Sequence, residues 1–176
     1  HPRSQKFVNS VIKNNRKLVG HFGCFFSHIN VYKTFMKSGK EMCIIFEDDV
    51  EFITKSFKYD LNRYIKYVPN DWSIILLGFH TAEKTHKDKN KNTYLKNNIY
   101  HNLEYFVGTH GYIINRRSCK ILLEKLKHPY WFLDWEISEL AKKGHLKIYA
   151  LSNILVCQPA SHNIYFNNKY IKINKK

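Results

Sequence analysis

The fold of this chain is decided by Met42-Cys43-Ile44-Ile45-Phe46-Glu47-Asp48-Asp49-Val50, in which a run of apolar residues ends in three adjacent acids. Five consecutive apolar residues bounded by charge are typical of a central strand that is covered on both faces. In open α/β sheets, ligands bind in the crevice beyond the carboxyl ends of the strands. Three acids placed there repel one another, so one interpretation is a divalent metal among them that carries a phosphate-rich substrate. The other interpretation is a solvated acidic turn.

Helical and strand patterns alternate on both sides of this run. Upstream, we expect a short helix from Ser4 to about Asn14 and, after Gly20 and Gly23, a second helix over residues 24–37. Downstream we expect a helix after Ser56, a strand over 72–78, a long polar loop over 79–98, short strands within 103–107 and 112–114, helices from 115 and over 134–143, and strands near 146–150 and 154–157. This order predicts the α/β class, with one domain over residues 1–176 and a mixed, mostly parallel central sheet.

The length of 176 residues suits one domain with a sizeable core. No apolar run reaches the ~18 residues that a membrane span needs, and no basic-then-apolar leader is visible. Because the chain begins with His1 rather than Met, we interpret it as a fragment of a longer protein.

The net charge of +15 raises the question of a nucleic-acid partner. The lysines are spread along the whole chain and alternate with asparagines, as in Lys87-Asp88-Lys89-Asn90-Lys91-Asn92. Solvated lysines on most faces explain this distribution better than a dedicated groove for nucleic acid does. We therefore expect no specific nucleic-acid partner, and only weak contact with phosphates or anionic membrane surfaces.

The four cysteines lie far apart and have no CxxC spacing, which argues against a zinc-finger site or a disulfide framework. Apolar neighbours surround each of them, as around buried free thiols. We infer a reducing compartment, and expect a cytoplasmic or membrane-associated protein.

The predicted helix over residues 24–37 turns His28 toward the interior, because Cys24, His28 and Val31 share its broad apolar face. A hydrogen-bonded core histidine and a functional histidine are both compatible with that position. A Cys24/His28 nucleophile pair has suitable spacing, but no third orienting group is evident in the sequence.

Two motifs together resemble glycosyltransferase family 25, which includes lipooligosaccharide and procollagen galactosyltransferases. They are Gly23-Cys24-Phe25-Phe26-Ser27-His28 and Ile45-Phe46-Glu47-Asp48-Asp49-Val50. Gly108-Thr109-His110-Gly111-Tyr112-Ile113-Ile114 is similar to a third block of the family, and Asp134 with Trp135 to a fourth. Family members also open with a strand that helps to hold the nucleotide base, and this chain is expected to begin after that strand.

The resemblance implies a GT-A-like domain that transfers a sugar from a UDP-sugar with inversion at the anomeric carbon. Galactose is the expected sugar, and a glycan or a hydroxylysine-type protein side chain the expected acceptor, as in lipopolysaccharide biosynthesis or collagen glycosylation. The alternative is a catalytically inactive domain of this type that binds a glycan or a partner. The oligomeric state is left open.

The resemblance also assigns roles to the three acids. Alternation along an extended segment puts Glu47 and Asp49 on one side and Asp48 on the other. We expect Glu47 and Asp49 to hold Mn²⁺ or Mg²⁺ on the donor diphosphate, with Asp49 as a direct ligand, and Asp48 to contact the donor.

An inverting transfer needs a base that takes the proton of the acceptor hydroxyl. Asp134 is the candidate and Glu136 the reserve, although Asp134 also suits a plain helix N-cap. His162 is a weaker candidate for a metal or phosphate contact, against an ordinary surface histidine. The expected substrate contacts, for which an ordinary helix face or strand-turn is the competing interpretation, are Ser27, His28, Gly108, Thr109, His110, Gly111 and Tyr112.

Overall fold

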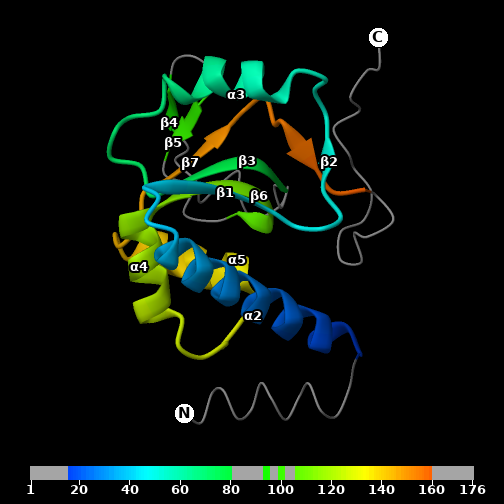
Figure 1. Ribbon diagram of the computed structural model, residues 1–176, viewed down its shortest axis with the longest axis vertical. Coiled ribbons are helices and arrows are strands. Elements are labelled where there is room, and N and C mark those ends of the chain that lie inside the picture. The colour runs from blue at the N-terminus through cyan, green and yellow to red at the C-terminus, as the bar shows by residue number, and fades with distance from the viewer. Residues whose placement is uncertain (1–15, 81–92, 96–98, 102–105, 160–176) are drawn as a thin grey trace.

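The computed structural model describes residues 16–80, 93–95, 99–101 and 106–159 (Figure 1). Its helices are α2 (Arg16–Lys37), α3 (Phe57–Ile65), α4 (Arg116–Lys125) and α5 (Leu133–Lys142). Its strands are β1 (Met42–Phe46), β2 (Glu51–Phe52), β3 (Ile74–His80), β4 (Thr93–Leu95), β5 (Ile99–His101), β6 (Val107–Asn115), β7 (Ile148–Leu151) and β8 (Val156–Cys157). The predicted α/β class is confirmed.

Six of the strands form a mixed sheet in the order β1-β6-β3-β7-β5-β4, while β2 and β8 form a separate antiparallel pair. The expectation of mostly parallel strands holds for strand direction, since β1, β3, β4 and β7 run the same way. It does not hold for neighbouring strands, because β6 is inserted antiparallel between β1 and β3. Within the described residues of this sheet, β3 and β7 form the one parallel pair.

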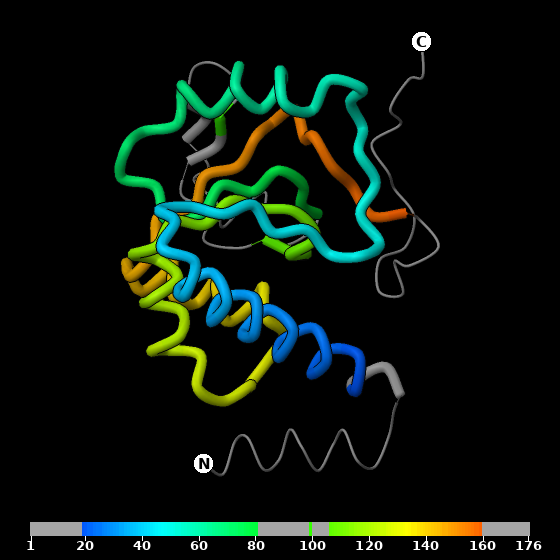
Figure 2. The backbone as a smooth tube through the Cα atoms, viewed as in Figure 1, coloured from blue at the N-terminus to red at the C-terminus, as the bar shows by residue number. Residues whose placement is uncertain are grey.

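The sheet separates two apolar cores. Helices α2, α4 and α5 cover one of its faces and α3 covers the other, as the backbone trace shows (Figure 2). Because side chains alternate along a strand, Ile74 and Leu76 of β3 join the first core and Ile75 and Leu77 join the second. Burial of such a side chain contributes about 1.5–3 kcal/mol. Strand β3 therefore anchors both layers, and the ends of its neighbours are fixed relative to it.

Strand β1 is not the central strand that its apolar run predicts. It lies at one end of the six-stranded order, and of its five residues only Ile45 is buried. The face of β1 opposite to Ile45 is partly covered by aromatic rings, since Phe46 packs against Phe52 and Phe57 at 5.2 and 5.7 Å between ring centroids. A short apolar run therefore does not distinguish an edge strand from a central one.

Helix α2 begins earlier than expected and contains Gly20 and Gly23, which the sequence predicted to precede it. A glycine costs about 1 kcal/mol in a helix interior, which is too little to end a helix with a large buried face. That face carries Phe25, Ile29 and Tyr32, all buried in the first core. Both glycines are open to solvent, with no heavy atom near the place of a Cβ.

Most other predicted elements agree with the structure to within a few residues, but in the described residues one strand, β6 (Val107–Asn115), takes the place of the two short strands expected within 103–107 and 112–114. The helix expected from 115 is α4, and Asn115 is its N-cap, because its side chain accepts a hydrogen bond from Ser118 N at 2.8 Å. The long loop predicted over 79–98 is interrupted, because β3 extends to His80 and β4 lies inside that range. The helix expected from Ser4, the residues before Phe106 in the expected strand, and His162 lie outside the described residues.

None of the helices in the described part of the chain combines the length and the apolar character that crossing a bilayer requires.

Candidate active site at the carboxyl ends of strands 1 and 3

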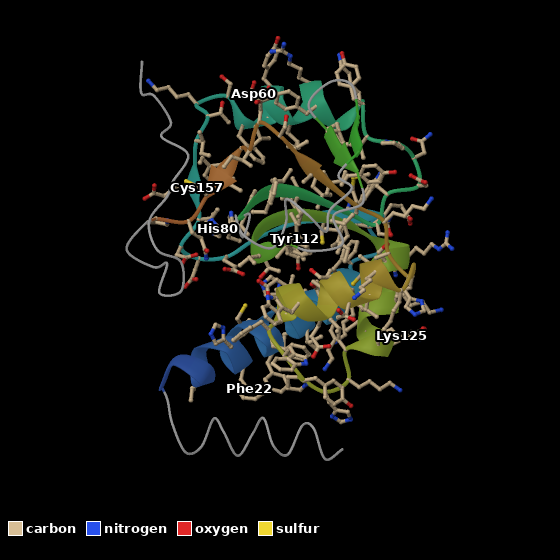
Figure 3. All side chains as sticks on the ribbon, turned by 180° about the vertical axis from the view of Figure 1, so that it is seen from behind. Phe22, Asp60, His80, Tyr112, Lys125 and Cys157 are labelled. Carbon is tan, nitrogen blue, oxygen red and sulfur yellow. The ribbon has the colours of Figure 1, made fainter. Side chains whose placement is uncertain are left out.

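The antiparallel pairing gathers polar residues at one edge of the sheet. Phe46, the last residue of β1, pairs with Gly111 of β6, and His80, the last residue of β3, pairs with Val107. The acids after β1 therefore meet the amino end of β6 and the carboxyl end of β3. Figure 3 shows His80 and Cys157 on the same side of the molecule, and Tyr112 where the sheet meets the helices.

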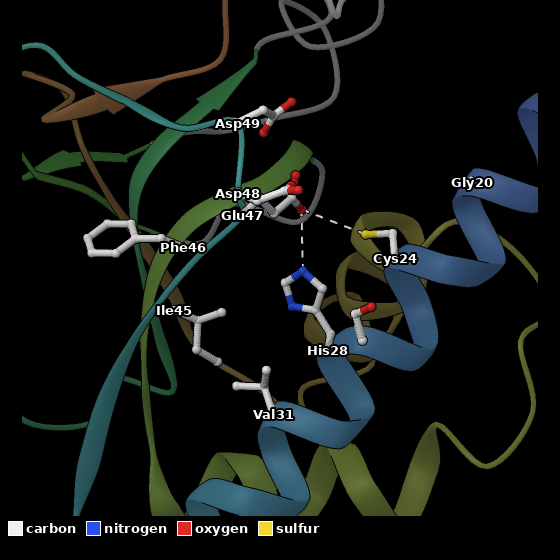
Figure 4. Close-up of a pocket in the computed structure, with 10 residues that line it drawn as sticks. Gly20, Cys24, His28, Val31, Ile45, Phe46, Glu47, Asp48 and Asp49 are labelled. Atoms are coloured by element: carbon white, nitrogen blue, oxygen red, sulfur yellow. Dashed lines mark hydrogen bonds and ion pairs between the residues drawn. The ribbon is translucent and has the colours of Figure 1, made fainter.

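Glu47 contacts several of the polar side chains at this edge of the sheet. Its Oε1 accepts a hydrogen bond from Thr109 Oγ1 at 2.6 Å and lies 3.3 Å from His28 Nε2. Cys24 Sγ donates to the same oxygen at 3.7 Å (Figure 4). Since Cys24 and His28 are one helical turn apart on α2, the helix presents both side chains to one carboxylate oxygen. These contacts connect α2 to the end of β1.

The second oxygen of Glu47 faces the other acids. Gln158 Nε2 donates to Glu47 Oε2 at 2.9 Å and lies 3.1 and 3.2 Å from the two oxygens of Asp49. Asp48 is exposed, whereas Glu47 and Asp49 are half-buried. The strand ends at Phe46 and Asp48 and Asp49 lie in a turn, so the alternation expected for an extended segment does not apply to these acids.

An open pocket of about 440 Å³ lies between α2 and these acids (Figure 4). Gly20, Ser27 and Val31 line it from the helix, and the residues from Ile45 to Asp49 line it from the strand and the turn. The absence of a side chain at Gly20 helps to keep this wall open. The three acids therefore face a cavity rather than bulk solvent alone.

The environment of Glu47 favours its ionised form. Burial raises the pKa of this carboxyl, but the hydrogen bonds from His28 and Thr109 and the nearby imidazoles of His28 and His110 outweigh it. The net result is a pKa below the ordinary value. Glu47 is therefore a fixed negative charge at the pocket.

Asp134 lies in the first turn of α5, whose N-cap position is occupied by Phe132 and not by Asp134. Its Oδ2 accepts from Gly108 N at 2.9 Å and its Oδ1 from Trp135 N at 2.9 Å. Burial raises the pKa of this carboxyl, and the two backbone N–H groups offset only part of that effect. Glu136 differs, because its Oε1 accepts from Tyr130 N and Trp131 N at 2.7 and 2.9 Å and so fixes the turn before α5.

His110 is buried, and neither of its ring nitrogens has a hydrogen-bond partner within the described residues. Burial, and then the neighbouring His80, lower the pKa of His110 to about 4, although Glu47 acts in the opposite direction. The ring lies between Gly78 and Gly108, where a Cβ would come within 2.6 Å of Nε2 and 2.9 Å of Nδ1. His110 is therefore a neutral imidazole that needs glycine on both sides.

The two glycines predicted to contact substrate have different surroundings. Gly108 has φ +91°, a left-handed conformation that favours glycine, and its N–H holds Asp134. A Cβ on Gly111 would meet Val156 Cγ2 at 2.4 Å and Phe46 at 3.4 Å. Gly111 thus makes room for protein side chains rather than for a ligand.

The remaining predicted contacts fall into two groups. Ser27 is exposed and lines the pocket. Tyr112 is 1% exposed, and its hydroxyl lies 2.8 Å from His28 Nδ1 and 2.6 Å from Tyr32 OH. Tyr112 therefore orients the His28 ring through Nδ1, the nitrogen that does not face Glu47.

The third group that the sequence did not reveal beside Cys24 and His28 is Glu47. It does not activate the thiol, because burial and the charge of Glu47 raise the pKa of Cys24 to about 12. A nucleophilic Cys24 therefore does not fit this site.

Sequence reasoning missed Gln158 and His80. Each follows an apolar run at the carboxyl end of a strand, and that position was the available signal. Their proximity to Glu47 depends on pairing between distant strands, which spacing along the chain does not reveal.

The layout is that of an α/β domain with carboxylates gathered beside an open pocket at the carboxyl ends of its strands, as in enzymes that take a phosphate-bearing substrate. Comparison with known families gives a more specific assignment. The model of glycosyltransferase family 25, described as an LPS biosynthesis protein, matches residues 3–135. The chain belongs to glycosyltransferase family 25.

One curated relative is procollagen galactosyltransferase 1 from Danio rerio, which is 28% identical to this chain over 110 residues. The match covers 59% of this chain but 17% of that relative. The chain thus corresponds to a small part of that longer protein.

Proposed function

We propose that this domain transfers galactose from a UDP-sugar to a glycan or to a hydroxylysine-type acceptor, with inversion and with the help of a divalent metal. The observation that carries the proposal is the convergence of Glu47 Oε2 and both Asp49 oxygens on Gln158 Nε2, at 2.9–3.2 Å. Three carboxylate oxygens gather around one amide nitrogen at the wall of an open pocket, and such a cluster of negative charge favours binding of a cation. Family membership supports the reaction class.

Glu47 and Asp49 would hold the metal, which is Mn²⁺ or Mg²⁺ because the ligands are all oxygen. Such ions take one or two carboxylates and complete their coordination with substrate phosphates and water. When bound, the ion neutralises charge on the departing diphosphate. The low pKa of Glu47 keeps one of these carboxylates ionised without the metal. Asp48 is exposed, lines the same pocket and is proposed to contact the donor.

Asp134 is proposed as the base that takes the proton of the acceptor hydroxyl. Its raised pKa brings the carboxylate nearer to the basicity that proton transfer needs. Gly108 N and Trp135 N hold its two oxygens and fix the orientation of the carboxylate.

Two exposed tryptophans next to Asp134 support a sugar-bearing acceptor. Trp131 and Trp135 are 56% and 51% exposed, and their ring centroids are 6.0 Å apart. Indole faces are partly negative and attract the C–H groups on the apolar faces of sugar rings. We propose that this pair receives the acceptor beside the base.

A glycan-binding domain without catalysis is the second candidate. It is favoured by one observation, that both oxygens of Asp134 already accept backbone hydrogen bonds. In that case Asp134 would serve only to attach Gly108 to α5.

The test is incubation of the full chain with UDP-galactose, UDP-glucose and UDP-N-acetylglucosamine, each with a panel of glycan and hydroxylysine-peptide acceptors, with and without Mn²⁺. Mn²⁺-dependent release of UDP with a glycosylated product supports the enzyme, and the anomeric configuration of the product tests inversion. Glycan binding without turnover of any donor supports the second candidate. No binding of any nucleotide sugar or glycan would contradict both.

A further inference from the structure

The two carboxylate oxygens of Glu47 have neighbours of different chemical character. Its Oε2 faces Asp49 and the amide of Gln158, where the metal-holding atoms are all carboxylate oxygens. Its Oε1 faces a thiol and an imidazole from α2. Oxygen ligands suit Mg²⁺ or Mn²⁺, whereas sulfur and nitrogen ligands suit Zn²⁺ and similar softer ions.

We propose that Cys24 Sγ, His28 Nε2 and Glu47 Oε1 form a zinc-binding site on the inner side of the pocket. It shares Glu47 with the site proposed for the donor metal but uses the other oxygen of that carboxylate. The proposal does not depend on sugar transfer, since it concerns binding of the ion alone.

The two distances from Glu47 Oε1 to the other ligand atoms are those of a tetrahedral zinc site. With Zn–S of about 2.3 Å and Zn–N and Zn–O of about 2.0–2.1 Å, ligands at tetrahedral angles lie roughly 3.3 Å apart for N and O and roughly 3.6 Å apart for S and O. The structure has 3.3 Å between His28 Nε2 and Glu47 Oε1, and 3.7 Å between Cys24 Sγ and the same oxygen. All three ligand atoms lie within 4.8 Å of one another.

The groups behind these ligands are those that a zinc site requires. A metal-binding histidine usually makes a hydrogen bond with its other ring nitrogen, and here His28 Nδ1 lies 2.8 Å from Tyr112 OH. Tyr112 is in turn held by Tyr32 at 2.6 Å. Thr109 donates to Glu47 Oε1 at 2.6 Å and fixes the carboxylate.

The site is rigid on the protein side and open on the other. Cys24 and His28 come from successive turns of one helix, and His28 and Glu47 have side chains only 5% and 20% exposed. Cys24, His28 and Glu47 all line the pocket, which leaves a fourth position for water or a small ligand. Bound zinc would release the thiol proton of Cys24 and would connect α2 to the acidic turn.

Cobalt is the probe, because Co²⁺ takes zinc sites and absorbs light in a way that identifies its ligands. The full chain is freed of metal and titrated with Co²⁺ and then with Zn²⁺, with absorption and calorimetry as readouts. We expect a near-ultraviolet thiolate-to-cobalt band and the strong visible bands of tetrahedral Co²⁺, both removed by one equivalent of Zn²⁺. We also expect Zn²⁺ to raise the melting temperature.

Variants identify the thiol. Cys24→Ser should abolish the thiolate band, whereas Cys43→Ser, a half-buried cysteine on β1, should keep it. Thr109→Val should weaken Zn²⁺ binding by about 10- to 100-fold, as loss of an outer hydrogen bond to a ligand does. Circular dichroism reports whether each variant is folded.

Absence of a thiolate band from the wild-type chain would overturn the proposal whatever the variants do, and so would a band that survives in Cys24→Ser. A hydrogen-bonded thiol without metal affinity has the same spacing in the structure and gives the first of these results.

Discussion

Glu47, after β1, and Asp134, at the start of α5, are half-buried carboxylates near the same edge of the sheet, yet their surroundings drive their ionisation in opposite directions. Glu47 is surrounded by side chains that favour its charge, chiefly His28 and Thr109, and its pKa falls. Asp134 is held by two backbone N–H groups, which do not offset its burial, and its pKa rises. The partners, and not the carboxyl group itself, decide which acid holds a charge and which is suited to accept a proton.

The largest expected effect tests the Asp134 side of this comparison. Asp134→Asn should lower the rate of sugar transfer by about 10²- to 10⁴-fold, the usual contribution of a general base. Binding of UDP-galactose, measured by calorimetry, should be unchanged because the proposed donor site is at Glu47 and Asp49. Glu139→Gln, an exposed acid on the same helix, is the control and should keep full activity. Near-normal turnover of Asp134→Asn would reduce Asp134 to a structural contact with Gly108.

The next-largest expected effect tests the Glu47 part of the comparison through Asp49, which contacts the same Gln158 amide as Glu47 does. Asp49→Asn should weaken Mn²⁺-dependent binding of UDP-galactose by about 100-fold, because one of two proposed metal ligands loses its charge. Asp48→Asn is the matched control, since Asp48 is adjacent but more exposed, and the contacts with Gln158 are made by Asp49. It should keep the dependence on Mn²⁺, even if affinity for the donor changes. Equal loss of the Mn²⁺ dependence in both variants would contradict a specific role of Asp49 as a metal ligand.

Some features of the fold can be predicted from the sequence and others cannot. The acidic end of β1, the inward position of His28 and the Asn115 cap all follow from local patterns, because they depend on neighbours within one helical turn or one strand. The edge position of β1 does not, since it depends on where β6 pairs.

The site is less predictable than the fold. Gln158 reaches Glu47 from more than one hundred positions away in the chain. The Tyr112 hydroxyl orients His28 from a strand that the sequence associated with substrate contact. Such contacts arise from tertiary packing, which a single sequence does not record.

A smaller expected effect concerns the contribution of each carboxyl group to the free energy of unfolding. The pKa of Glu47 is below its value in the unfolded chain, so its contribution is present above about pH 4.5 and is lost as pH falls through the lower folded value. Glu47→Gln should therefore lower the free energy of unfolding by about 1–2 kcal/mol at neutral pH, and by less in acid.

The contribution of Asp134 to the free energy of unfolding changes with pH in the opposite direction. Its folded pKa is raised, so its favourable contribution is complete below about pH 3.8 and is lost as pH rises through the folded value. Urea unfolding across this range, on the wild type and both single variants, measures the two slopes. Slopes of the same sign would contradict the comparison.

The smallest effect concerns the acceptor side near Asp134. Trp135→Ala should raise the acceptor KM by about 2- to 12-fold, the equivalent of the 0.5–1.5 kcal/mol of an aromatic contact, with donor affinity unchanged. Tyr59→Ala, an exposed aromatic residue on α3 beyond the opposite face of the sheet, is the control and should have no effect. An unchanged acceptor KM in Trp135→Ala would place the acceptor elsewhere.

The opposite ionisation of the two acids is tested most directly by a titration of the side-chain carboxyl groups by ¹³C NMR, with the two resonances assigned from Glu47→Gln and Asp134→Asn. We expect Glu47 to titrate with a pKa below its ordinary value of 4.5 and Asp134 with a pKa above its ordinary value of 3.8. A midpoint for Glu47 above 4.5, or for Asp134 below 3.8, would contradict the division of roles between the two acids.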